Sequence, residues 1–100
     1  MSADYTHEGQ QRILALLKTL AGNEINGMAP SDIARAQACS ASCVTRDLDN
    51  LRTAGFAEQV PESGLWRLSP ELVQIAVRFQ VGLSRAANRI AETESRFTRQ

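Results

Sequence analysis

The sequence predicts a mainly α-helical fold with one small β-hairpin, followed by a long C-terminal helix. Two observations predict it. Apolar residues recur at helical spacing in three segments before residue 55, and then alternate in two short segments within 56–68. From residue 71 onwards there is no proline, and the apolar residues keep one regular spacing to the end. We therefore expect one domain over 1–69 and a heptad helix over 70–100.

Composition bounds the class of protein. The 100 residues are 43% hydrophobic and 22% charged, which is ordinary for a soluble domain. No apolar run is long enough to cross a bilayer, and the polar start MSADYTHEGQQ lacks the apolar core of a signal peptide. We expect a cytoplasmic protein that does not bind a membrane. Residues 1–66 carry 5 basic and 8 acidic side chains, residues 67–100 carry 6 and 3, and the net charge is zero. Indiscriminate binding of nucleic acid is therefore not expected.

The first two helices are predicted from their apolar stripes and terminal signals. The first begins after Thr6, a capping residue, and runs to about Ala21. Its apolar stripe consists of Ile13, Leu16, Leu17 and Leu20. The segment AGNEING then ends it. Pro30 suits the first turn of a second, short helix, which turns Ile33 inward and ends near Gln37.

A third helix is predicted from Ser40, a good N-cap, to about Ala54, with Gly55 placed to stop it. Its buried face consists of Val44, Leu48 and Leu51. The opposite face presents Ala41, Ser42, Thr45, Arg46, Asp49 and Arg52. This helix therefore offers a polar surface to a partner.

Two short strands follow, FAEQV and LWRL, joined by the turn PESG. Period two places Trp66 and Leu68 on one side and Arg67 on the other. We expect Trp66 to pack in the core against the first helix rather than to stack on a base. Ser69-Pro70-Glu71 then predicts a helix start, with a cap, a proline in the first turn and an acid near the positive end.

The last helix carries a heptad pattern. The pattern is apolar except at Thr93, and its positions are spaced alternately four and three apart: Leu72, Ala76, Phe79, Leu83, Ala86, Ile90, Thr93 and Phe97. About 28 helical residues extend roughly 42 Å, too far to be covered by a small domain. We therefore expect a homodimer that pairs through this stripe. The arginines beside it are expected to be solvated flanks, with DNA contact as the alternative: Arg78, Arg85, Arg89 and Arg96.

Three helices followed by a hairpin are the layout of a winged helix-turn-helix. The stretch GMAPSDIARAQACSASCVTRDLDNLRTAGFAEQVPESGLWRLSPELVQIA resembles the N-terminal DNA-binding domain of IclR-type transcriptional regulators. Its strongest parts are SDIARA, VTRDLDNLRTAGFAEQ and LWRLSPELVQIA, and the last is similar to the family's second wing strand and linker helix. The large effector domain of that family has no counterpart here, so we expect no small-molecule effector and no cofactor.

The resemblance implies a sequence-specific regulator of transcription that binds double-stranded DNA. The recognition helix would be 40–54 and the wing 56–68. The candidate DNA contacts are Ser40, Ala41, Ser42, Thr45, Arg46, Asp49 and Arg67. Arg46 matches the family's recognition-helix arginine and could grip a guanine or a phosphate, whereas Ser42 and Thr45 would discriminate bases weakly. Arg67 would meet the flanking backbone or minor groove.

Some positions depart from the family's pattern. Ala38 stands where the turn glycine is usual, and Ala41 where a basic or polar residue is common. Asp47 and Asp49 add negative charge beside Arg46. Ala41, Asp47 and Asp49, together with the neutral net charge, favour the alternative function, a winged helix whose acidic first two-thirds dock a basic protein partner.

The cysteines and the other reactive side chains do not match a catalytic or metal-binding sequence motif. Cys39 and Cys43, four residues apart, are expected to be reduced and partly buried. A redox or metal sensor is the alternative, although zinc takes about four ligands and His7 is the only histidine. No nucleotide-binding loop, zinc-protease or serine-hydrolase motif occurs. We therefore expect neither an enzyme nor a metal site.

Overall fold

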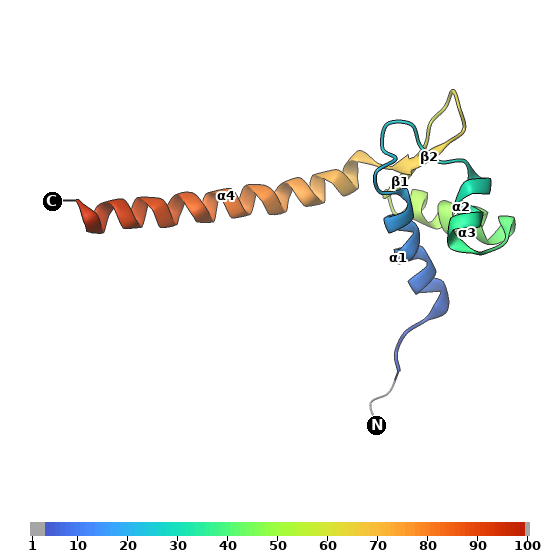
Figure 1. The fold of residues 1–100 in the computed structure, drawn as a ribbon, viewed down its shortest axis with the longest axis horizontal. Coiled ribbons are helices and arrows are strands. Elements are labelled where there is room, and N and C mark those ends of the chain that lie inside the picture. The colour runs from blue at the N-terminus through green and yellow to red at the C-terminus, as the bar shows by residue number, and fades with distance from the viewer. Residues whose placement is uncertain (1–3, 100) are drawn as a thin grey trace.

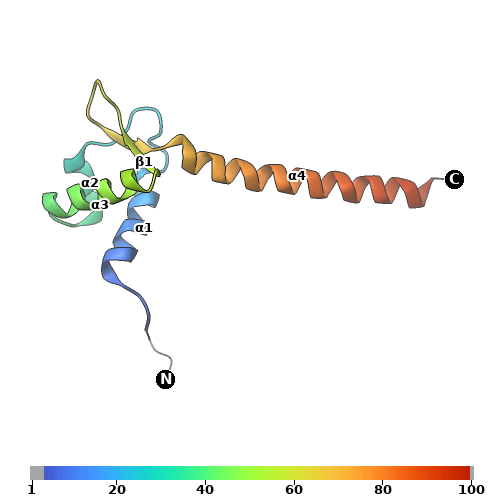
Figure 2. The ribbon, with the colours of Figure 1, turned by 180° about the vertical axis from the view of Figure 1, so that it is seen from behind.

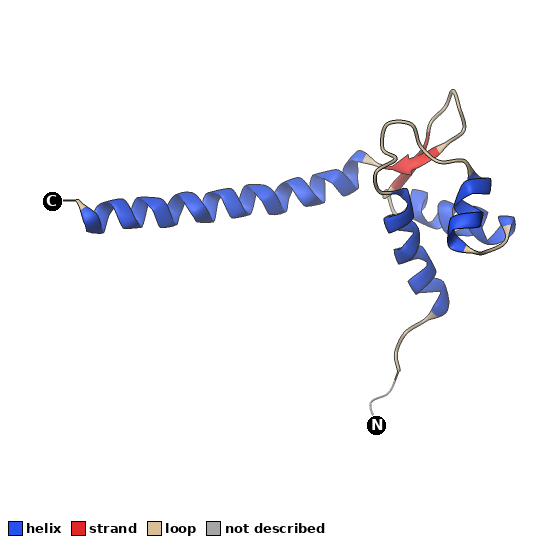
Figure 3. Ribbon diagram, viewed as in Figure 1, coloured by secondary structure: helices blue, strands red, loops and turns tan. Residues whose placement is uncertain are grey.

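The computed structural model describes residues 4–99. Residues 1–3 of the predicted domain 1–69 and residue 100 of the predicted helix 70–100 lie outside the described residues. The elements are α1 (Glu8–Leu20), α2 (Pro30–Gln37), α3 (Ala41–Thr53), β1 (Ala57–Gln59), β2 (Trp66–Leu68) and α4 (Pro70–Thr98). In Figure 1, α1, α2, α3 and the hairpin gather at one end of the molecule, while α4 projects away from them. The view from behind in Figure 2 and the colouring of Figure 3 show the same mainly helical arrangement, which confirms the predicted fold class.

One hydrophobic core joins the three short helices to the hairpin. It consists of Leu16, Leu20, Ile33, Val44, Leu48, Leu51, Ala57 and Trp66. The buried face predicted for α3 is confirmed, and Trp66, with 8% of its surface exposed, lies in the core as expected. Burial of these side chains holds α3 against α1 and α2, so its polar face points outward.

The start of α1 differs from the prediction. The N-cap is His7, whose Nδ1 accepts a hydrogen bond from the Gln10 amide at 3.3 Å. The predicted cap, Thr6, is wrong because Asp4 competes for its side chain: the Thr6 hydroxyl donates to the Asp4 carboxylate at 2.7 Å. Helix α1 therefore begins at Glu8, one residue later than a cap at Thr6 would place its start.

The turn between α2 and α3 is closed by Ala38 in a left-handed conformation, with φ +53° and ψ +46°. The amide of Ala38 donates to the Arg35 carbonyl at 3.3 Å, and that of Cys39 to the Ala34 carbonyl at 3.1 Å. This bonding pattern usually places a glycine at the left-handed residue. The predicted N-cap of α3 is confirmed, since Ser40 Oγ accepts from the Cys43 amide at 3.2 Å.

The hairpin is antiparallel, in the register Ala57↔Leu68, Glu58↔Arg67 and Gln59↔Trp66. A backbone bridge that the sequence did not predict lies at the edge of β2 that faces away from β1. Met28 bridges to Trp66, with amide-to-carbonyl distances of 2.7 and 2.8 Å in the two directions. Gly27 permits this approach, because its φ is +82° and a Cβ there would lie 2.9 Å from Cβ of Leu65. The loop before α2 is therefore fixed to the hairpin.

The long helix α4 begins at Pro70, as predicted. Ser69 occupies the N-cap position, but its hydroxyl donates to the Gly55 carbonyl instead of accepting from α4. It therefore ties the start of α4 to the end of α3, which corrects the expected cap. None of the residues of α4, all of which the structure describes, is buried. Within residues 4–99 no helix combines the length and apolar character needed to span a membrane.

Candidate nucleic-acid interface

The exposed face of α3 brings most of the predicted contact residues together. Ala41, Ser42, Thr45, Arg46 and Asp49 are all exposed on this helix, and Ser40 is exposed at its N-terminus. Arg67 lies apart from them on β2, where it is partly buried. The predicted set thus forms one helix face plus one separate wing residue.

The hydroxyl groups on this face are held by local hydrogen bonds. Ser40 Oγ serves as the cap of α3 and lies 3.2 Å from Ser42 Oγ. The Thr45 hydroxyl donates to the Ala41 carbonyl at 3.0 Å. Because its proton is engaged there, the Thr45 oxygen is left mainly as an acceptor toward an outside group.

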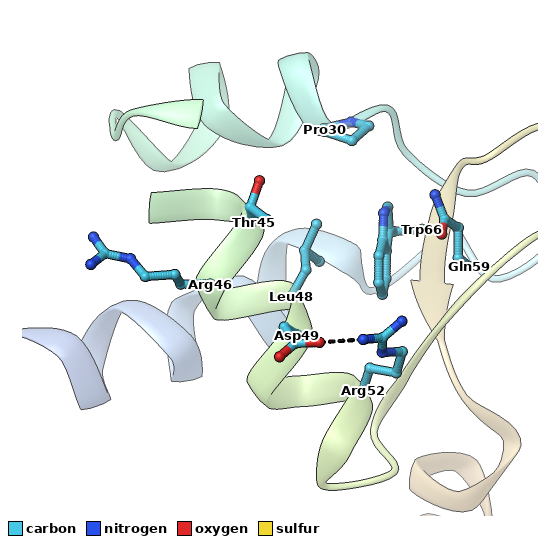
Figure 4. Close-up of a pocket in the computed structure, with 8 residues that line it drawn as sticks. All are labelled: Pro30, Thr45, Arg46, Leu48, Asp49, Arg52, Gln59 and Trp66. Carbon is cyan, nitrogen blue, oxygen red and sulfur yellow. Dashed lines mark hydrogen bonds and ion pairs between the residues drawn. The ribbon is translucent and has the colours of Figure 1, made fainter. Parts of the chain in front are cut away.

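Arg46 is the cation that α3 leaves available. Among the ion pairs within residues 4–99, none includes Arg46, and its side chain is exposed. It borders three surface hollows, which lie toward Trp66, toward Cys39 and toward Arg12. Figure 4 shows it extending away from the other labelled side chains. An anion approaching α3 would meet this guanidinium without displacing an internal partner.

Asp47 does not belong to this face, which corrects the expectation that it adds negative charge beside Arg46. It is 4% exposed and faces Arg12 of α1. The guanidinium of Arg12 donates from Nε to Oδ2 at 2.5 Å and from Nη2 to Oδ1 at 3.0 Å. The hydrogen bonds to Asp47 raise the pKa of Arg12 above its ordinary value. Helical spacing from Val44 and Leu51 does place Asp47 on the inward side of α3, but the sequence does not show its partner, because Arg12 lies 35 residues earlier.

Two further ion pairs neutralise charges around α3. Asp49 pairs with Arg52 on the same helix, and both side chains are exposed. Arg67 donates from Nε to Glu58 Oε1 at 2.8 Å, and its Nη1 lies 3.5 Å from the Ile25 carbonyl oxygen. Arg67 is therefore engaged across the hairpin rather than free on the wing.

A groove of about 430 Å³ separates α3 from the hairpin (Figure 4). Its lining residues are Pro30, Thr45, Arg46, Leu48, Asp49, Arg52, Gln59 and Trp66. Leu48 and Trp66 give it an apolar floor, and charged and amide groups stand at its rim. Two of these rim residues, Arg52 and Gln59, were not among the predicted contacts. Arg52 could have been placed on this face from the sequence, because it lies seven residues, or two turns, after Thr45. Gln59 could be placed there only once the register of the hairpin was known.

The two cysteines lie beside the start of α3. Cys43 is buried, and its thiol lies 3.9 Å from Asp47 Oδ2, while Cys39 is half-buried. Burial, reinforced by the neighbouring Cys43 thiol, raises the pKa of Cys39. In the part of the chain that the structure describes, no group of three or more His, Cys, Asp or Glu residues is arranged to hold a metal ion.

No protein-family model and no curated protein matches this sequence. Two solved structures match its fold. One is assigned as an IclR transcriptional regulator from Silicibacter sp. TM1040, with a TM-score of 0.66 and 25% identity over 87% of this chain. The other is an IclR family transcriptional regulator from Brucella abortus, with a TM-score of 0.61 and 21% identity over 78% of this chain. This chain has the fold of the part of these IclR regulators that it matches, about a third of each.

The IclR-like fold confirms the winged helix-turn-helix predicted from the sequence. In it, α2 and α3 are the helix-turn-helix pair, and β1 and β2 form the wing. The chain spans 35% of the length of the first solved structure and 32% of the second. Both are described as transcriptional regulators.

Proposed function

We propose that this chain binds double-stranded DNA through the exposed face of α3 and regulates transcription. The observation that carries the proposal is Arg46, an exposed guanidinium in no ion pair among the described residues, on the helix that the winged helix-turn-helix holds outward. The N-terminal half of such a helix enters the major groove. There Arg46 binds a guanine edge or a phosphate, while Ser42 and Thr45 contact neighbouring bases.

The other predicted contacts have narrower roles in this proposal. The backbone amides at the Ser40 start of α3 receive a phosphate, because the positive end of the helix dipole favours an anion. Asp49 accepts a hydrogen bond from a cytosine amino group. Arg67 reaches the flanking DNA backbone only after exchanging its bond to Glu58 for a phosphate.

The proposal includes a homodimer that pairs through α4. Its heptad stripe is largely uncovered: Phe79 is 69% exposed, Ile90 68% and Phe97 83%. Pairing with a second copy would bury this stripe and hold two α3 helices at a fixed spacing, for half-sites about 34 Å or more apart. Light scattering at micromolar concentration is expected to give the mass of two chains, and the mass of one chain would refute the dimer.

The alternative, docking of a basic protein by the acidic part of the chain, has less support. Four acidic side chains are already paired with arginines of the same chain: Asp32, Asp47, Asp49 and Glu58. These pairs reduce the negative charge available to a partner. The unpaired cation on α3 favours an anionic ligand instead.

Titration of a duplex that the chain selects from a random-sequence pool, at several salt concentrations, tests DNA binding. The affinity of the wild-type chain is expected to fall steeply as salt rises, because each neutralised phosphate releases counterions. Arg46→Ala should weaken binding. The matched control is Arg35→Ala, since Arg35 is an exposed arginine on α2 that pairs with Asp32. Absence of binding, or binding insensitive to both salt and Arg46→Ala, would contradict the proposal.

A further inference from the structure

The groove between α3 and the hairpin offers a second contact to DNA. We infer that Arg52 and Gln59 form a phosphate site at the rim of this groove, which holds the DNA backbone beside the contact of Arg46. The inference rests on the proposed function, because it needs α3 to face duplex DNA. It assigns a binding role to two residues that base readout does not use.

The shape and lining of the groove fit a sugar-phosphate strand. Leu48 and Trp66 form an apolar floor in a hollow of about 430 Å³, and Pro30 closes its upper side in Figure 4. Deoxyribose carries most of its apolar surface on its carbon atoms, which suits such a floor. The polar groups stand at the rim, where the phosphates of a strand would lie. In this view the Arg52 guanidinium lies below Trp66, and Gln59 lies to the right of Trp66.

Both rim residues are held in place and still have donors to spare. The Arg52 guanidinium contacts Asp49 through Nη2 and has five N–H groups in all. Gln59 donates from Nε2 to the Gly64 carbonyl at 2.9 Å, which uses one of its two amide hydrogens. Arg52 is 58% exposed, so a phosphate can reach it from solvent. Each residue therefore presents an oriented donor at low cost in side-chain entropy.

The groove is continuous with the face that we propose to read the bases. Thr45 and Arg46 line its near end and Arg52 its far end, along a single helix. A strand whose bases face Thr45 and Arg46 would continue across Arg52 toward the wing. Asp49 lies between the two arginines and holds Arg52 through Oδ1, which leaves its Oδ2 for the proposed base contact, while its charge opposes a phosphate at its own position.

The salt dependence of duplex binding tests this site, because it counts neutralised phosphates. Arg52→Gln should make the negative slope of log affinity against log salt shallower, by about 0.9 for each bound chain. It should also weaken binding several-fold at low salt. Gln59→Glu, which places a negative charge at the same rim, should weaken binding as well. The matched control is Arg35→Gln, because Arg35 is also exposed and paired at three residues' distance, yet does not line the groove.

The outcomes separate this inference from the proposed function. An unchanged slope in Arg52→Gln, together with lost binding in Arg46→Ala, refutes the phosphate site and leaves DNA binding intact. Equal decreases in Arg52→Gln and Arg35→Gln also refute it, because they would reflect net charge rather than the groove. No binding of DNA by the wild-type chain refutes the proposed function. Circular dichroism is expected to show folded variants, since all three side chains are exposed.

Discussion

The guanidinium of Arg12 on α1 holds the buried carboxylate of Asp47 on α3, with Nε 2.5 Å from Oδ2 and Nη2 3.0 Å from Oδ1. A buried carboxylate is tolerated when it is paired and hydrogen-bonded. Asp47 follows Arg46 directly in the sequence, so one residue faces outward and the next fixes α3 to α1. The pair thereby helps to set the orientation of the proposed recognition face.

A double-mutant cycle on Arg12→Met and Asp47→Leu should detect this coupling. Each single variant is expected to lower the free energy of unfolding, because it leaves a charge without its partner. The double variant should recover part of the loss. Urea denaturation measures all four forms. The coupling should exceed that of the exposed pair Asp32–Arg35, and equal couplings would contradict the structural role.

The left-handed turn residue predicts a stabilising substitution. Ala38→Gly should raise the free energy of unfolding by about 0.5–1 kcal/mol, because glycine adopts positive φ without steric cost while losing more chain entropy. Ala36→Gly is the matched control, since Ala36 lies within α2 at ordinary helical angles. That control should be destabilised by about 0.5–1 kcal/mol. Chemical denaturation measures the free energy of unfolding of both variants. An equal decrease in Ala38→Gly and Ala36→Gly would argue against strain at the left-handed turn residue.

The dimer predicts that the two sides of α4 respond differently to charge. Leu83→Glu should shift the protein from dimer to monomer, because Leu83 lies in the heptad stripe. Val81→Glu should leave the dimer in place, since Val81 lies on nearly the opposite side of the helix. Both are half-exposed aliphatic residues, at 50% and 42%. Analytical ultracentrifugation measures the outcome, and a monomer with Val81→Glu alone would refute this pairing face.

Release of Arg67 from its internal partner should strengthen DNA binding. Glu58→Gln removes the carboxylate that accepts from Arg67 Nε at 2.8 Å. If the wing meets the DNA backbone, the free guanidinium should raise the affinity and steepen the salt slope by up to about 0.9 for each chain. Glu62→Gln on the hairpin turn removes the same charge without freeing Arg67. Identical effects of the two substitutions would exclude a specific wing contact.

The thiol of Cys39 should react slowly with iodoacetamide near neutral pH. Burial and the Cys43 thiol raise its pKa, so a smaller fraction is present as the reactive thiolate. In the Cys43→Ser variant, burial still raises the pKa of Cys39. The alkylation rate of this folded variant should therefore begin to rise at a higher pH than the rate of the same chain when it is unfolded. A profile displaced to lower pH would instead favour the thiol-sensor alternative, as would loss of DNA binding in the double variant Cys39→Ser, Cys43→Ser.

Local signals in the sequence sufficed for most of the fold. Helical spacing predicted the buried face of α3, and Ser40 and Pro30 marked helix starts that the structure confirms. The cap predicted at Thr6 was wrong, and Ser69, which does occupy the N-cap position of α4, makes no cap hydrogen bond. Both side chains found other partners, Asp4 and the Gly55 carbonyl, and capping propensity does not account for such competition.

The site was less predictable because its charges are decided by tertiary contacts. The pairing of Asp47 with Arg12 joins residues 35 apart, and the pairing of Arg67 with Glu58 depends on the hairpin register. The sequence placed the face of α3 correctly but could not tell which of its charges are neutralised. The bridge from Met28 to Trp66 was missed for the same reason, since it joins a loop to a strand far along the chain.

Selection from a random pool of duplex DNA, at low and near-physiological salt, would show whether this chain reads a DNA sequence. Wild-type chain and Arg46→Ala should be compared in parallel, because Arg46 is the proposed base contact. We expect the wild type to enrich a two-fold symmetric motif, and Arg46→Ala to lose that motif. Failure of the wild-type chain to enrich any motif at either salt concentration would contradict a sequence-specific regulator.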